Sequence, residues 1–218
     1  MTRRTLLASA LVAGCGRKLA PRYFGWLFVA SASERGIAVA DLAEFRRAAT
    51  IPLNRVPGQV LRAASRVFVT CPEVHSISVI DPMRLAVTGK IDLPGRIVAA
   101  AVVPTGGSMA VLIERPALLL LVDTATGAVT KKVALPAAPQ GFDVNDAMAA
   151  VTVPGSVVRV SLGDARVLGT TPTGSDCRAI RFRADGQTIL AGVPDARQIV
   201  TIDAASGALL ARLPMPFA

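Results

Sequence analysis

The hydrophobic pattern of this chain consists of short apolar runs, separated by turns rich in Gly, Pro and Asp. The clearest stretch has runs at 66–70, 76–80, 86–93 and 97–103, and each is followed at once by a turn residue or a Cys-Pro break. Runs of this length bounded by turn residues predict β-strands. No convincing helix is predicted, and no run approaches the roughly twenty apolar residues that would span a bilayer.

The same series of predicted strands recurs about every forty residues. Its second strand ends in Asp41, Asp81, Asp123 and Asp203, which are spaced 40, 42 and 80 residues apart, and Ser161 stands in the long gap. A fixed period of this length with several strands per unit is typical of a β-propeller.

The sequence therefore predicts an all-β fold, a β-propeller built of four-stranded antiparallel blades, with about five blades in this chain. The run at 97–103 is taken as the fourth strand of the second unit. The expected units of the propeller, which covers 25–218, are about 25–65, 66–107, 108–147, 148–187 and 188–218.

The acidic residues of the repeat have a local explanation. In Asp123…Gly127 and Asp203…Gly207 an Asp is followed four residues later by Gly. The carboxylate can cap its own turn, and glycine can adopt the left-handed conformation at the exit. These acids are therefore predicted to be turn residues, and no calcium-loop pattern accompanies them.

The N-terminus has the composition of an export signal. Two arginines precede an apolar segment over 5–13, which ends in Leu11-Val12-Ala13-Gly14-Cys15. An aliphatic residue, two small residues and a cysteine at this place resemble the lipobox of bacterial lipoproteins. The resemblance implies a signal peptide over 1–14, lipidation of Cys15 and a tether over 15–24. A plain secretory signal, and a twin-arginine signal at 2–7, are the alternatives.

The second unit resembles a known repeat. Val67-Phe68-Val69-Thr70, then Ser76–Asp81, and then Val87, Ile91 and Leu93-Pro94 look like the repeat of bacterial YVTN propellers, the YncE-like proteins. These are related in shape to the quinoprotein amine dehydrogenase heavy chain and the nitrite reductase haem d1 domain. The resemblance covers about 25–218.

Members of that family usually close a ring of seven blades, whereas five units are counted here. Three explanations stay open: a closed ring of five blades, a chain shortened by about two blades, and self-association of two copies that completes the ring. An open ring would leave unpaired blade edges and an exposed core, which are a liability. Among the three explanations the shortened chain is favoured.

The formal charge of +9 is concentrated near the start of the chain, where 16–66 holds nine Lys or Arg against three acids. This indicates either a basic face toward anionic lipid or a polyanion, or a solvated first unit. Nucleic-acid binding is not expected, because aromatic residues make up only 4% of the chain and no stacking motif is present.

Few residues suggest chemistry. His75 is the only histidine, so a metal site of several imidazoles is excluded, and His75 is expected to be an exposed loop residue. No Cys-x-x-Cys-His, nucleophile elbow or phosphate-binding glycine loop is present. Accordingly no catalytic, cofactor-binding or metal-binding residue is predicted, and Cys15, as a lipidation site, is the one site residue.

Two further groups remain. Cys71 and Cys177 lie in units that are not neighbours in a ring, so two separately packed thiols are expected rather than a disulfide. Tyr23, Phe24 and Trp26 cluster at the start of the first strand. A core or closing-strand role is favoured for them over contact with a lipid interface.

Together these features favour an exported binding or scaffold protein of the bacterial cell envelope and periplasm, held on the membrane by a lipid anchor. Its ligand, a protein or a small molecule, would bind the propeller face, and no cofactor is expected. The alternatives are a subunit of a periplasmic oxidoreductase of the amine dehydrogenase or haem d1 type, a lactonase-like enzyme, and an assembly factor of the envelope.

Overall fold

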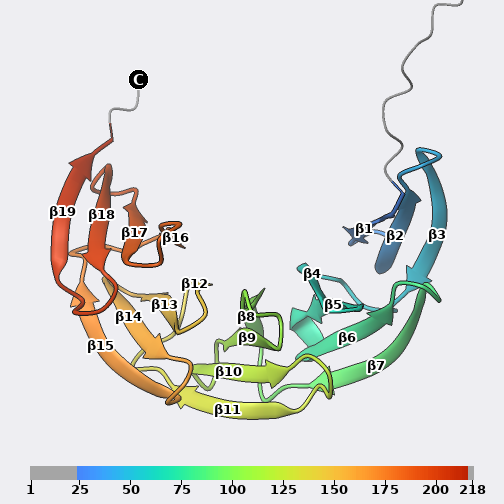
Figure 1. The fold of residues 1–218 in the computed structure, drawn as a ribbon, viewed down its shortest axis with the longest axis horizontal. Coiled ribbons are helices and arrows are strands. Elements are labelled where there is room, and N and C mark those ends of the chain that lie inside the picture. Colours follow the sequence, from blue (N-terminus) through green and yellow to red (C-terminus); the bar gives the residue numbers. More distant parts are fainter. Residues whose placement is uncertain (1–23, 216–218) are drawn as a thin grey trace, which may run out of the picture.

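The computed structural model describes residues 24–215. Five antiparallel sheets follow one another around an open arc, each formed by strands consecutive in sequence (Figure 1). The chain is a β-propeller, as the sequence predicts. The described helical structure is one 3-10 turn, Pro72–Val74.

The first sheet contains three described strands: β1 (Trp26–Ser31), β2 (Gly36–Asp41) and β3 (Arg46–Pro52). The second contains β4 (Val60–Ala63), β5 (Arg66–Cys71), β6 (Ser76–Asp81) and β7 (Ala86–Asp92), and the third contains β8 (Ile97–Val102), β9 (Ser108–Ile113), β10 (Leu118–Asp123) and β11 (Val129–Ala134). The fourth contains β12 (Gly141–Val144), β13 (Met148–Val153), β14 (Ser156–Ser161) and β15 (Arg166–Pro172), and the fifth contains β16 (Ala179–Phe182), β17 (Thr188–Val193), β18 (Gln198–Asp203) and β19 (Leu209–Pro214).

Each four-stranded sheet begins on the inner side of the arc with β4, β8, β12 or β16 and ends on the outer side (Figure 1). In the first sheet β1 takes the place of the second strand, because it pairs with β2 in the register in which β5 pairs with β6. The innermost position of this sheet is therefore not filled by any residue between 24 and 215.

The strand predicted over 97–103 belongs to a different sheet from the one expected. Its counterpart β8 pairs with β9, so it opens the third sheet instead of closing the second. The turn after it joins two strands of one hairpin, since Gly106 N donates to the carbonyl of Val103 at 2.7 Å. Each repeat counted in the sequence thus starts one strand later than the sheet that contains most of its strands.

The turn between the two outer strands has the same form in all five sheets. The side chain of Asp41, Asp81, Asp123 or Asp203 accepts hydrogen bonds from main-chain N–H groups two to three residues later, as in Asp123 Oδ1 with Thr126 N at 2.7 Å. Ser161 does this in the fourth sheet. The predicted turn role of these residues is confirmed.

The residue four positions after each of them has a positive φ, namely Phe45, Leu85, Gly127, Ala165 and Gly207. A β-bulge lies at the same register of every outer strand pair. The bulge and the left-handed residue together set the same hairpin geometry five times.

The core lies between neighbouring sheets. Strand residues alternate between the two faces, so each inner sheet buries one apolar row against the sheet before it and another against the sheet after it. Cys71 and Cys177 are buried in this core and are free thiols, as predicted. Burial raises the pKa of the Cys177 thiol.

The two ends of the arc leave these rows uncovered. Leu27 is 48% exposed, while Val67, at the same position of the second sheet, is 4% exposed. At the other end Leu213 is 50% exposed and its counterpart Ile91 is 7% exposed. The end faces thus present the same side-chain positions that form the interfaces within the chain.

Candidate functional site

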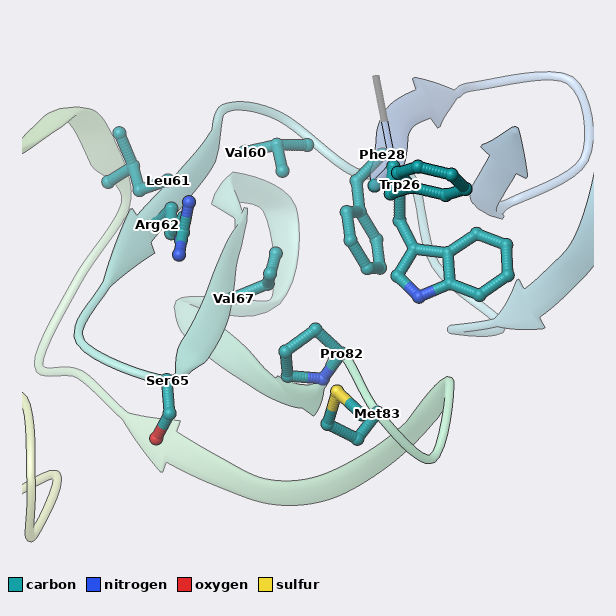
Figure 2. A pocket seen from close by; sticks show the side chains of 11 residues that line it. Trp26, Phe28, Val60, Leu61, Arg62, Ser65, Val67, Pro82 and Met83 are labelled. Atoms are coloured by element: carbon teal, nitrogen blue, oxygen red, sulfur yellow. The ribbon is translucent and has the colours of Figure 1, made fainter. Parts of the chain in front are cut away.

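A hollow with a volume of about 630 Å³ lies between the first and second sheets (Figure 2). Most of the wall of the hollow is apolar. The residues of the wall come from β1, β4, β5 and the β6–β7 turn. The residues that line it are Phe24, Gly25, Trp26, Phe28, Val60, Leu61, Arg62, Ser65, Val67, Pro82 and Met83.

The hollow exists because β1 has no strand on its inner side among the described residues. In the second sheet β4 covers the corresponding edge of β5, through the pairs Val60–Val69 to Ala63–Arg66. Trp26 and Phe28 project from β1 into the uncovered space, and Met83 and Pro82 close it from below (Figure 2). The hollow is therefore a site for an apolar group or an extended segment.

The hollow opens on one rim of the propeller. Leu42 N donates to the carbonyl of Gly25 at 3.0 Å, so the β2–β3 turn lies beside the start of β1. Phe45 in that turn is 87% exposed, Met83 in the β6–β7 turn 85%, and Phe24 80%. Together with Trp26, these side chains form the apolar rim patch.

Charged side chains of both signs flank the apolar rim patch. Arg46 is paired with Glu44, and Arg84 lies 3.7 Å from Asp81. Arg62 lines the hollow and is exposed, and it forms no ion pair with any described residue. The Arg62 guanidinium can therefore bind an anion that enters the hollow.

The pKa values of the turn carboxylates are set by their hydrogen bonds. The N–H groups of Arg84 and Met83 lower the pKa of Asp81, and the N–H and hydroxyl of Thr126 lower that of Asp123. These hydrogen bonds keep the carboxylates ionised, and the carboxylate oxygens already accept bonds from the turn. They are poor candidates for general acid–base catalysis.

The other predicted residues lie apart from the hollow. His75 ends the short 3-10 turn on the opposite rim, is exposed and has a φ of 51°, which confirms the predicted loop position. The core or closing-strand role favoured for this aromatic cluster is wrong for Phe24, which precedes β1 and is largely exposed at the mouth of the hollow, while Trp26 lies in β1 and is exposed rather than in the core. Cys15 and Tyr23 fall outside the described residues.

Two absences hold for residues 24–215. No group of three His, Cys, Asp or Glu side chains could hold a metal ion there. No helix in that part of the chain is long and apolar enough to cross a membrane.

Sequence reasoning missed one buried charge. Arg159 of β14 is 5% exposed and donates to the carbonyls of Ala204, Ala205 and Ser206 at 2.5–3.0 Å. It therefore ties the fourth sheet to the turn of the fifth. An Arg within an apolar strand is the only sign of this role in the sequence, and it does not reveal the partner.

The described geometry defines the class: an open-arc β-propeller with an apolar hollow at one end. No family model and no curated protein matches this chain. Among solved structures, Kuenenia stuttgartiensis hydrazine synthase is similar, with a TM-score of 0.73 and 16% sequence identity. The similarity covers 87% of this chain and 63% of that chain, so this chain spans less than two thirds of the neighbour. At this identity the similarity shows the fold.

Proposed function

We propose that this chain is a lipid-anchored β-propeller of the bacterial cell envelope that binds a protein or small-molecule ligand. The observation that carries the proposal is the sequence Leu11-Val12-Ala13-Gly14-Cys15 at the end of an apolar segment. Acyl chains on Cys15 would hold the propeller at a membrane surface without a spanning helix.

A binding role is supported by the character of the candidate site. The hollow is largely apolar with one free cation among the described residues, which suits recognition of a ligand more than bond-breaking chemistry. The described acids nearby are held in turns or ion pairs. We propose a relationship to the YVTN, YncE-like propellers, which is supported by the residues quoted for that resemblance, most of which lie in β5, β6 and β7.

The anchor is tested by replacing Cys15. The wild-type chain is expected in the membrane fraction with the mass of an acylated cysteine, and Cys15→Ser is expected to lose the added mass. Ser9→Ala, in the same apolar segment, is the matched control and is expected to keep it. An unmodified Cys15 in the wild-type chain would refute the anchor.

We also propose that the two exposed end faces are covered by further sheets of the same repeat, from the same protein or from a second copy. The support is positional: Leu27 and Leu213 are half exposed where their counterparts in the inner sheets are buried. Light scattering on the purified chain tests the second copy, because a monomeric mass at high concentration would exclude it.

A periplasmic oxidoreductase subunit is the second candidate. One observation favours it: the similar solved structure is named as a hydrazine synthase. This candidate predicts a bound cofactor or a partner chain that carries one. The visible spectrum of the purified protein tests it, since a Soret band would indicate haem and a colourless protein would favour the binding role.

A further inference from the structure

We propose that the apolar rim patch, formed by Phe24, Trp26, Phe45 and Met83, is the surface of this protein that enters a membrane. The occupant is the boundary between headgroups and acyl chains of an anionic bilayer. The inference rests on the proposed function only in that an anchor at Cys15 would bring the propeller to a membrane.

The turns between the two outer strands differ from sheet to sheet in the side chains they expose. In the third, fourth and fifth sheets the exposed tip residues of the outer turn are small or polar, namely Ala125 and Thr126, Gly163 and Asp164, and Ala205 and Ser206. At the same two positions the second sheet has Met83 and Arg84 and the first has Ala43 and Glu44; Phe45 is the next residue, where the last three sheets have Gly127, Ala165 and Gly207. Large apolar side chains at the tip therefore occur only next to the hollow, among the described turns.

Phe45 has an unfavourable backbone conformation. Its φ is 50°, in the left-handed region, where the third and fifth sheets have Gly127 and Gly207. A bulky residue is disfavoured there, and Phe45 regains nothing by packing because it is 87% exposed. Backbone strain retained without a packing benefit is found at functional positions. An exposed aromatic ring at a tip is suited to insertion into a lipid interface.

The charges beside the patch are of both signs. The two turns carry the acids Asp41, Glu44 and Asp81 and the arginines Arg46 and Arg84, which form the pairs Arg46–Glu44 and Arg84–Asp81. Arg62 and Arg66 lie on the same rim, around the Ala64–Ser65 turn, and Arg66 donates to the carbonyl of Ala125 at 2.7 Å. Four arginines thus stand against three acids on this rim of the first two sheets, and this small positive excess beside the apolar tips favours anionic lipid.

The chain enters the propeller on this rim. β1 begins here, because Gly25 is bonded to the turn after β2. Ten residues lie between Cys15 and Trp26, and the eleven steps from one to the other span at most about 36–40 Å. An acylated Cys15 would therefore hold this rim closer to the membrane than the opposite one, which carries His75.

Trp26 provides the test, because it is the only tryptophan in the chain and it lies in the patch. The full chain is bound to phosphatidylglycerol vesicles with and without brominated acyl chains. Bromine quenches a tryptophan that reaches the acyl region. We expect a blue shift of the Trp26 emission and quenching of most of it, and a weaker effect on phosphatidylcholine vesicles.

The matched variants separate the patch from the anchor. Phe45→Gly combined with Met83→Ser is expected to lose most of the quenching, while its thermal midpoint does not fall below that of wild type, because glycine suits the φ of Phe45. Val74→Ser removes an exposed apolar side chain from the opposite rim and is expected to leave the quenching unchanged.

Mass spectrometry of the same samples reports whether Cys15 is acylated. Quenching in an unacylated sample would support the patch even though the anchor had failed. An acylated chain bound to vesicles with an unquenched Trp26 would overturn the patch and leave the anchor standing. A blue shift that grows with protein concentration without vesicles would mean that a second copy covers the patch, and it would also overturn the proposal.

Discussion

The guanidinium of Arg159 occupies the space that a side chain at Gly207 would need. A Cβ built on Gly207 would lie 2.6 Å from Cζ of Arg159, and the guanidinium is held there by the carbonyls of Ala204, Ala205 and Ser206. The position of the Arg159 guanidinium, from the fourth sheet, therefore requires that residue 207, in the outer turn of the fifth sheet, has no side chain. The left-handed φ of 79° at Gly207 adds a second reason for glycine.

Gly207→Ala is expected to destabilise the protein by about 2–4 kcal/mol, the sum of left-handed strain and displacement of a buried, bonded charge. Gly106→Ala is the matched control, because Gly106 has the same φ and nothing lies within 4 Å of its Cβ position. The control is expected to cost about 1 kcal/mol in urea denaturation. In an Arg159→Ala background the cost of Gly207→Ala should fall to that of the control; an unchanged cost would refute the dependence.

Phe45→Gly is expected to stabilise the fold by about 0.5–1 kcal/mol, because it relieves a positive φ and removes no packing. Leu85→Gly is the comparison at the equivalent turn position. Leu85 has a φ of 51° but packs against the core between the first two sheets, so its replacement is expected to destabilise. Thermal midpoints of the two variants should move in opposite directions, and equal shifts would contradict this account.

Stability is expected to fall at acidic pH through the turn carboxylates. The pKa of Asp123 lies below its ordinary value of 3.8, owing first to the main-chain and side-chain bonds from Thr126. The pKa of Asp203 is lowered by the hydroxyl and N–H of Ser206. A folded-state pKa below the unfolded value gives stabilisation that is present above about pH 4 and is lost as the pH falls through the folded pKa.

The thermal midpoint measured from pH 5 to pH 2 checks this. Asp123→Asn combined with Asp203→Asn keeps an acceptor at each turn but removes the titrating groups, so the midpoint should fall less with acid. Asp195→Asn is the control, because Asp195 is exposed and accepts no hydrogen bond from described residues. If the double variant followed the wild-type curve, the turns would not be the source of the acid sensitivity.

The thiols of Cys71 and Cys177 are expected to resist alkylation in the native protein. Both are buried and free, and burial raises the pKa of Cys177, which lowers its thiolate fraction at neutral pH. In a Cys15→Ser chain, iodoacetamide should modify neither cysteine until denaturant is added. Rapid modification of one thiol in native buffer would contradict the packing of its sheet.

Leu213→Ser and Ile91→Ser probe the same position in an end sheet and an inner sheet. Ile91→Ser is expected to cost about 3 kcal/mol or more, because it removes a side chain buried between two sheets. Leu213→Ser should cost less than about 1 kcal/mol in the monomeric chain, since half of Leu213 is already exposed. Equal costs would mean that another surface covers the fifth sheet under the conditions of the measurement.

The repeat, the sheet class and the Asp turns could be predicted because each has a local signal. Alternation and turn residues fix the middle and outer strands, which are six or seven residues long. The inner strands β4, β12 and β16 have only four residues each, and they mix polar with apolar side chains. Four residues carry too little pattern to be separated from a loop.

The hollow and the Arg159 contact could not be predicted, because both depend on how neighbouring sheets are placed. Arg159 bonds to carbonyls 45–47 residues away, and any chain segment has carbonyls. The hollow depends on a strand position that the described residues leave open. Phe45 and Leu85 escaped notice for a different reason, since positive φ is usually signalled by glycine and here it is not.

Three hydrogen bonds of the same kind, in which a main-chain N–H donates to a side-chain oxygen, join neighbouring sheets one repeat apart. Gln59 Oε1 accepts from Ala100 N, Asp146 Oδ1 from Thr105 N, and Asp143 Oδ2 from Phe182 N, over 41, 41 and 39 residues. Each sheet is thus coupled to its immediate neighbours, and the chain behaves as a one-dimensional array in which order can spread from one unit to the next. Amide hydrogen exchange should consequently be slowest in β9, β10, β13 and β14 and fastest in the terminal sheets, with opening that proceeds inward from both ends.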